Sequence, residues 1–335
     1  MEPTSDRSSS LGRRAFVAAA LGAAASVPLG VGWADAPAHA RDPLPVPRPT
    51  DFISWREIPL PGIRPVVAAL MADPSGAIWF SDATSDSLVR IVPETGATTK
   101  FDTAASTNSM VMAPDGTVWF AATPGVGALD PATGALAWYA LPTPYPKLAA
   151  GADGRIWFTD AAHSGIGSID RSGTIATYTS GGATEVSLIT VAVDGKVWFT
   201  RGGNELGVFD PGSGVFRVRT TGPTELTGLT SVPSGGVWAG GPSRLMKFDD
   251  DANMLTSIPM RTASGVGGTP KILVPGVHAE LFFRATDLGI GRVNGDDTIT
   301  FMMPPFEKSA PMGLAVTPAG SVWFAHRFRE TLGYF

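Results

Sequence analysis

The sequence of 335 residues contains no cysteine, which excludes disulfide bonds and thiol chemistry. Charged residues make up only 16 %, and the formal net charge is −5. A negative balance argues against nucleic acid or an anionic membrane surface as a partner. No stretch shows the periodicity of a long helix, whereas 40 glycines and 29 prolines predict many tight turns.

A short aromatic motif recurs seven times along the chain. Its copies read GAIWFSD, GTVWFAA, GRIWFTD, GKVWFTR, GGVWAGG, AELFFRA and GSVWFAH. The anchor aromatic residues in these copies are Trp79, Trp119, Trp157, Trp198, Trp238, Phe282 and Trp323. Their successive spacings are 40, 38, 41, 40, 44 and 41 residues, and a fixed period of this length is typical of a repeat architecture.

One repeat reads as four short strands. In the third repeat an apolar run from Leu148 ends in Asp153-Gly154, a dipeptide that favours a hairpin turn, and the strand RIWFTD follows. Two more strands, Ile166–Asp170 and Thr174–Thr179, complete the set. We therefore predict an all-β fold, a seven-bladed β-propeller of four-stranded antiparallel blades over residues 51–335. A sandwich or a solenoid of the same strands is the alternative, although no capping repeats are visible for a solenoid.

The two ends of the predicted propeller complement each other. Ser54–Leu60 reads as a fourth strand with no blade before it, and Thr331–Phe335 reads as a third strand with nothing after it. We expect the N-terminal strand to complete the seventh blade, which would remove an open sheet edge.

The first forty residues resemble an export signal. Arg13-Arg14 lies within a twin-arginine pattern, an alanine-rich apolar run follows, and Ala38-His39-Ala40 forms an A-x-A cleavage site. The apolar run is too short to span a membrane. We predict a twin-arginine signal over residues 1–40 and a proline-rich linker over residues 41–50, with export to the periplasm, the cell wall or the medium; an ordinary secretory signal is the alternative.

Strand direction predicts which residues share a face of the ring. The start of each first strand and the end of each second strand lie on one face, and the Asp-Gly turns lie on the other. The second strands end at Asp82, Ala122, Asp160, Arg201, Gly241, Ala285 and His326. The residues eleven positions before the anchors are Ala68, Asn108, Pro146, Ser187, Thr227, Lys271 and Met312. We expect a monomer that binds a small molecule or peptide on this face, at the mouth of the central channel.

Two residues further back than Ser187 and Thr227 stand Glu185 and Glu225 of blades four and five, and from all three sets we take candidate site residues. The candidate catalytic residues are His326 and Lys271. The candidate ligand-binding residues are Asp82, Asn108, Asp160, Glu185, Arg201, Glu225 and Met312. As a structural alternative, Asp160 would pair with Arg201 and Asp82 with His326. His163 lies on the same face but farther from the axis, and we expect His278 to be a solvated turn residue on the opposite face.

The repeats resemble those of the virginiamycin B lyase and streptogramin lyase-like propellers. The resemblance rests on IWFTD with IGSID in the third repeat, on Gly289–Val293 in the sixth, on Arg56–Pro61 and on Pro311–Leu314, and it extends over all seven repeats. It implies a carbon–oxygen lyase that opens a cyclic depsipeptide by elimination. In that chemistry a histidine removes a proton, and a magnesium ion held by glutamates stabilises the enolate.

The sequence departs from this pattern at the positions that carry the chemistry. Ala310 and His326 stand where the resemblance implies glutamates, and Met312 and Lys271 stand where it implies histidines. Magnesium is therefore implied by resemblance only, without its usual ligands. We expect a ligand-binding scaffold with an altered site. The alternatives are an active lyase or hydrolase on a cyclic depsipeptide or lactone, and an interaction platform at the cell envelope.

Overall fold

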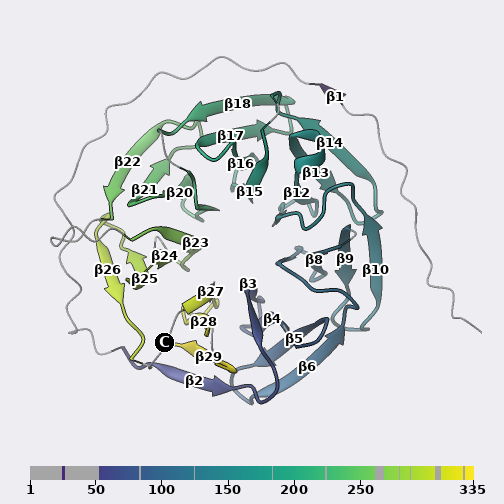
Figure 1. Ribbon diagram of the computed structural model, residues 1–335, viewed down its shortest axis with the longest axis vertical. Coiled ribbons are helices and arrows are strands. Elements are labelled where there is room, and N and C mark those ends of the chain that lie inside the picture. Colours follow the sequence, from purple (N-terminus) through teal and green to yellow (C-terminus); the bar gives the residue numbers. More distant parts are fainter. Residues whose placement is uncertain are drawn as a thin grey trace, which may run out of the picture.

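A computed structural model describes residues 25–26, 53–82, 84–123, 125–182, 184–222, 225–260, 268–278, 280–286, 288–305, 311–326 and 329–335. Seven antiparallel four-stranded sheets form a closed ring, which confirms the predicted seven-bladed β-propeller (Figure 1). Within the described ranges the helical structure is one short turn, η1 (Ala161–His163). None of the helical structure found there is long or apolar enough to span a membrane.

Each blade runs from an innermost to an outermost strand. Blades one to three are β3 (Pro65–Ala72), β4 (Ile78–Asp82), β5 (Ser87–Val92) and β6 (Ala97–Asp102); β7 (Ser109–Met112), β8 (Val118–Ala122), β9 (Gly125–Leu129) and β10 (Leu136–Ala140); and β11 (Leu148–Ala150), β12 (Ile156–Asp160), β13 (Gly165–Ile169) and β14 (Ile175–Thr179). The two-residue strand β1 (Ala25–Ser26) pairs in parallel with β14.

The remaining blades follow the same order. Blades four to six are β15 (Val186–Val191), β16 (Val197–Arg201), β17 (Glu205–Asp210) and β18 (Val215–Thr220); β19 (Gly228–Ser231), β20 (Val237–Gly241), β21 (Arg244–Phe248) and β22 (Met254–Pro259); and β23 (Pro270–Pro275), β24 (Leu281–Ala285), β25 (Gly289–Val293) and β26 (Ile299–Met302). Blade seven is β27 (Pro311–Val316), β28 (Val322–His326), β29 (Thr331–Tyr334) and β2 (Arg56–Pro59).

The anchor aromatics hold neighbouring blades together. Each of seven buried clusters joins the anchor of one blade to apolar residues of the next. Trp79 of blade one packs with Phe120 of blade two, and Trp323 of blade seven packs with Phe80 of blade one, so the series closes on itself. A buried tryptophan removes roughly 150–250 Å² of surface from water, which makes each anchor a large part of its interface.

Within the blades a second pattern supports the packing. Six anchors are followed by a phenylalanine, and in five blades this residue faces a glycine on the third strand. These pairs are Phe120–Gly127, Phe158–Gly167, Phe199–Gly207, Phe283–Gly291 and Phe324–Gly333. A Cβ at any of these glycines would lie 2.1–2.3 Å from the ring, so the ring requires glycine. Blade five has the reverse arrangement, with Ala239 facing Met246.

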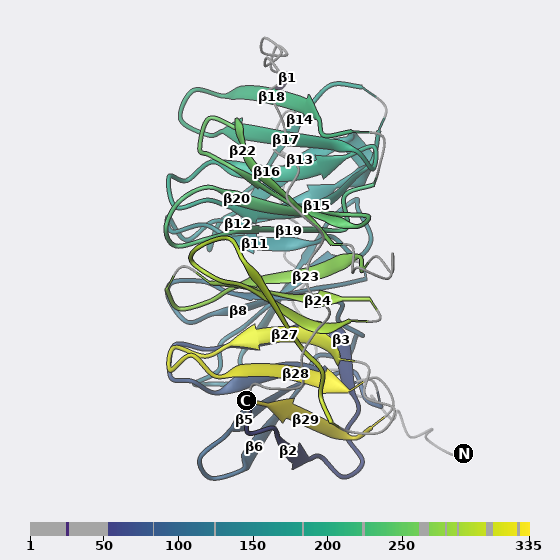
Figure 2. The ribbon, with the colours of Figure 1, turned by 90° about the vertical axis from the view of Figure 1, so that its left-hand side faces the viewer.

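The N-terminal strand completes the seventh blade, which confirms the predicted closure. Strand β2 pairs antiparallel with β29, with Arg56 opposite Tyr334 and Pro59 opposite Thr331. The two segments lie side by side at the base of both ribbon views (Figures 1 and 2). The predicted export signal and linker, residues 1–50, lie outside the described residues apart from β1.

Candidate functional site

The ring has two faces with different chemistry. We call the face at the ends of β4, β12, β16 and β28 the strand-end face, and the opposite face, which carries the Asp-Gly turns, the turn face. The predicted site residues lie on the strand-end face, as the strand directions require. They fall into a buried group and an exposed group.

Asp82, at the end of β4, belongs to the buried group. Its carboxylate accepts hydrogen bonds from the backbone N–H groups of Arg64 and Thr84 and from the hydroxyls of Thr84 and Ser85, and Lys100 Nζ lies 3.3 Å from Oδ2. Burial, the largest effect, raises its pKa, but the hydrogen bonds outweigh burial and bring the pKa of Asp82 to about 2. The carboxylate is thus ionised, and its hydrogen bonds are made with groups of its own blade rather than with a ligand.

Asp160 and Arg201 are also buried, but they do not pair with each other as the structural alternative suggested. Asp160 accepts a hydrogen bond of 2.6 Å from the Thr143 hydroxyl and lies 2.7 Å from Nδ1 of His163. Arg201 Nε lies 2.8 Å from Glu205, and its Nη1 donates to the backbone carbonyls of residues 180 and 181. Asp160 and Arg201 therefore each bind other groups, and Arg201 reaches the backbone that follows β14 of blade three.

His326 ends β28 with no exposed side-chain surface, and its partner is Glu57 rather than Asp82. The distance from His326 Nε2 to Glu57 Oε1 is 3.2 Å. The same carboxylate holds Arg329 at 3.1 Å and accepts a hydrogen bond from Thr331. Burial lowers the pKa of His326, Glu57 opposes this, and Arg329 lowers it further. No motif pointed to Glu57, because its contacts join opposite ends of the chain.

The exposed group is small. Glu185 and Glu225 are both exposed and lie on either side of the turn after β16, where Gly202 N–H donates to the Glu185 carbonyl and Gly203 lies close to the Glu225 side chain. Lys271 is exposed at the start of β23. Two further predicted residues, Asn108 and Met312, are partly buried at the starts of the innermost strands.

Lys147, which the sequence reasoning missed, lies just before β11. It is partly buried, and its Nζ donates to the backbone carbonyl of Asn108 in blade two at 3.3 Å. Burial lowers the pKa of Lys147, and no carboxylate among the described residues forms an ion pair with it. Counting eleven residues back from the anchor Trp157 selects Pro146, so Lys147 was passed over by one position. Its signal in the sequence was a single lysine within the otherwise apolar run PKLAA.

The residues at the family positions do not fit a magnesium ion. Magnesium prefers oxygen ligands in octahedral geometry, and the thioether of Met312 and the paired imidazole of His326 supply none. Ala310 lies outside the described residues. Across the described part of the chain, no group of three or more histidine, aspartate or glutamate side chains is arranged to hold a metal.

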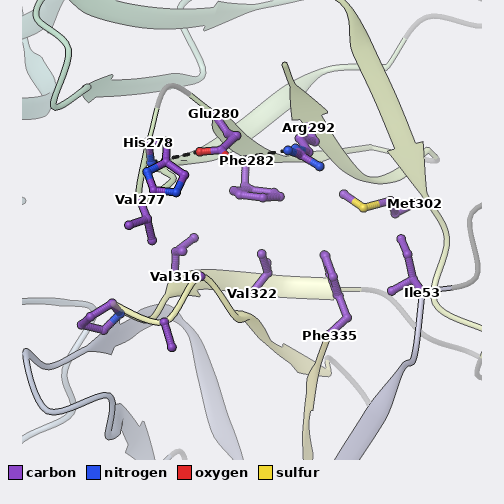
Figure 3. A pocket seen from close by; sticks show the side chains of 13 residues that line it. Ile53, Val277, His278, Glu280, Phe282, Arg292, Met302, Val316, Val322 and Phe335 are labelled. Atoms are coloured by element: carbon purple, nitrogen blue, oxygen red, sulfur yellow. Dashed lines mark hydrogen bonds and ion pairs between the residues drawn. The ribbon is translucent and has the colours of Figure 1, made fainter. Parts of the chain in front are cut away.

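Three cavities open on the turn face, where the sequence predicted no site. One of about 570 Å³ lies between blades one and seven, and the other two have a more distinctive lining. The larger, about 840 Å³, lies where the innermost strands of several blades end, and its lining includes Met71, Met110 and Met112. The smaller, about 460 Å³, lies between blades six and seven; Phe282 and Phe335 line it together with His278 (Figure 3). His278 is exposed in its turn, as expected, but it also borders this cavity.

Similar proteins are found by sequence and by structure. Virginiamycin B lyase of Nocardia farcinica (strain IFM 10152) is 27 % identical over 252 residues, which cover 75 % of this chain and 74 % of that protein. A structure of streptogramin B lyase matches with a TM-score of 0.72 at 23 % identity, covering 84 % of this chain and 96 % of that one.

A catalytically inactive virginiamycin B lyase from Staphylococcus aureus with quinupristin matches with a TM-score of 0.73 at 21 % identity, covering 84 % of this chain and 98 % of that one. At these identities the structures support the fold alone. A sequence model of the virginiamycin B lyase family matches residues 53–241, more than half of the chain. The chain therefore belongs to the virginiamycin B lyase family.

Proposed function

We propose that this protein binds a small molecule or peptide at the strand-end mouth of its channel, as a monomer, without the metal-assisted elimination that the family resemblance implies. The observation that carries the proposal is the pair of residues at the family positions. Met312 has no group that can abstract a proton, and His326 is buried against Glu57. A general base must reach the proton that it removes, and neither residue meets this requirement.

The charged side chains of the strand-end face support a polar ligand. Glu185 and Glu225 provide negative charge at blades four and five, whereas Lys147 and Lys271 provide positive charge at blades three and six. Separated charges of both signs around one mouth suit a peptide or another molecule with both an amino and an acidic group. The S. aureus virginiamycin B lyase was solved with quinupristin, so a protein of this fold accommodates that compound.

The test is to incubate the purified protein, supplied with magnesium, with quinupristin and to separate the products by chromatography and mass spectrometry. We expect no product above the rate without protein. Elimination would give a linear isomer of unchanged mass and altered retention time, and hydrolysis would add the mass of water. Either product, formed catalytically, would overturn the binding proposal; a virginiamycin B lyase assayed in parallel is the positive control.

Lys147 favours a second candidate function, a lyase or hydrolase that uses a displaced base. Its pKa is lowered by burial, and an amine that loses its proton more readily is suited to proton transfer. If the assay above shows turnover, Lys147→Met should abolish it and Lys271→Met should leave most of it. Equal loss in both variants would instead indicate a general charge effect.

We also propose export by the twin-arginine route, which the paired arginines of the N-terminal segment support. Lysine does not reproduce the guanidinium geometry. Changing Arg13 and Arg14 together to lysine should therefore retain the precursor in the cytoplasm, as measured by fractionation and immunoblotting. Mature protein outside the cytoplasm at the normal level would contradict this.

A further inference from the structure

The cavity between blades six and seven is a slot with two charged side chains on its blade-six side. Phe282 forms one wall, and Val322 and Phe335 face it from the other side (Figure 3). Glu280 and Arg292 lie on the same side as Phe282, next to its ring. The volume of about 460 Å³ falls within the range of roughly 300–1,000 Å³ that is usual for small-molecule sites.

Blade one shows how the same place is filled elsewhere in the ring. There the anchor Trp79 lies opposite Arg90 on the third strand, just as Phe282 lies opposite Arg292 in blade six. Asp73 completes the blade-one arrangement. Its Oδ2 accepts hydrogen bonds from the indole Nε1 of Trp79 at 3.1 Å and from Arg90 Nε at 3.0 Å. Aromatic ring, carboxylate and guanidinium thus satisfy one another.

Blade six keeps the arginine, whose guanidinium lies 6.0 Å from the centre of the Phe282 ring, but it lacks the tryptophan and the aspartate of blade one. Phe282 is smaller than tryptophan and has no indole N–H, and Gly276 occupies the position of Asp73, because both residues donate to the residue four positions later. The remaining carboxylate, Glu280, reaches Arg292 Nη2 only at 3.5 Å. Arg292 Nε is buried with no hydrogen-bond partner among the described residues, and 43 % of the side chain is exposed, compared with 27 % for Arg90.

Glu280 itself is held on the turn side of the slot. Its Oε2 accepts a hydrogen bond of 3.1 Å from the backbone N–H of His278. A hydrogen bond with its own backbone N–H, the largest effect, lowers the pKa of Glu280; burial opposes this, and the His278 N–H and the charge of Arg292 lower it further. The ionised carboxylate is therefore tied to the turn, and it engages Arg292 through a single long contact.

We propose that this slot binds a flat aromatic carboxylate, with its ring against Phe282 and its carboxylate on Arg292. Such a ligand supplies the two groups that blade one provides internally, a larger aromatic surface and an acceptor for the guanidinium. Aromatic stacking and a charge-assisted bond from arginine to carboxylate act together in this arrangement. The site lies on the turn face, apart from the strand-end mouth, and is independent of the function proposed there.

Isothermal titration calorimetry with 2-naphthoate, and with the neutral 2-naphthylmethanol for comparison, tests the proposal on the whole protein. We expect saturable binding of the acid at one site and binding of the alcohol weaker by about tenfold or more, because the charged hydrogen bond is lost. No binding of 2-naphthoate at millimolar concentration would overturn the proposal. Equal affinity for acid and alcohol would also overturn the role of Arg292.

Variants locate the site. Phe282→Trp restores the anchor of the other six blades and should abolish binding without lowering the melting temperature. Arg292→Gln should weaken binding by about tenfold or more. The matched control Arg90→Gln, which breaks the blade-one arrangement, should lower the melting temperature and leave the Kd unchanged. Unchanged binding in Phe282→Trp would place the ligand elsewhere and overturn the proposal.

A transplant of the blade-one residues is the sharpest variant. A Cβ at Gly276 would lie 2.8 Å from Glu280 Oε2, so Gly276→Asp requires Glu280→Ala, which is the residue blade one has there. Together with Phe282→Trp, these changes should fill the slot from within, abolish naphthoate binding and raise the melting temperature. Retained binding in this triple variant would contradict the proposed location.

Discussion

Blade three and blade seven use the same position in different ways. The second strand ends at Asp160 in blade three and at His326 in blade seven, and both residues are almost completely buried, with exposed fractions of 0 % and 2 %. Asp160 is held by Thr143 and His163, which lie close to it in the sequence, whereas His326 contacts Glu57, which comes from the far end of the chain. The residue at this position thus stabilises a single blade in blade three. In blade seven, at the seam where β2 pairs with β29, it helps to hold the ring closed.

The largest test of this difference is to remove the closing strand. Deleting residues 53–60 exposes the edge of β29 and leaves its backbone groups without partners. We expect insoluble or unfolded protein, measured by gel filtration and circular dichroism. A soluble deletion variant with an unchanged melting temperature would show that blade seven does not depend on β2.

A smaller test compares single carboxylates. Glu57→Gln removes the ion pair with Arg329 and changes the contact with His326, and it should lower the free energy of unfolding by about 1–3 kcal/mol, as for hydrogen bonds to charged groups. Asp160→Asn should lower the free energy of unfolding by a similar amount, because an amide replaces one of the two buried carboxylate oxygens that face Thr143 and His163.

The two variants should differ in where the protein opens. Limited proteolysis should cut Glu57→Gln near its N-terminal strand, whereas Asp160→Asn should resist there as the wild type does. Identical cleavage patterns would mean that the seam is no weaker than an ordinary blade.

The smallest effect is a pH dependence specific to the seam. Because the folded-state pKa of His326 lies below its unfolded value of about 6.5, the unfolded state binds more protons between the two values. The free energy of unfolding is therefore not reduced by His326 above about pH 6.5. It falls as the pH drops toward the folded-state pKa, by at most about 1.4 kcal/mol per pH unit. Denaturant unfolding of His326→Gln should show a weaker loss of stability between pH 7 and pH 5 than the wild type; an equal loss would assign the dependence to other groups.

The sequence predicted the fold more completely than the site. Trp79, Trp119 and the later anchors predict the number of blades, because each anchor lies in the same short motif and each copy of the motif corresponds to one blade. Strand direction also placed Asp82 and His326 on the same face. The sequence could not tell that these two residues are occupied by other side chains, since their partners, Lys100 and Glu57, are set by three-dimensional contact rather than by spacing.

The same limit explains what was missed. Lys147 differs from an ordinary surface lysine only in its burial, which depends on the neighbouring blade. The cavity at Phe282 has a signal in the sequence, namely the one anchor that is not tryptophan, but its meaning appears only beside Arg292 and Gly276. A departure from a repeat thus indicates where to look, and the contacts then show what the departure allows.

The facing phenylalanine and glycine pairs also affect how the repeats can diverge. In a pair such as Phe158 and Gly167, enlarging the glycine alone produces a clash, and shrinking the phenylalanine alone leaves a void. Single substitutions at either position are therefore selected against, and the two positions are expected to change together during evolution. Ala239 and Met246 of blade five have the reversed sizes that such a paired exchange would leave. This coupling helps to explain why phenylalanine follows the anchor in six of the seven copies.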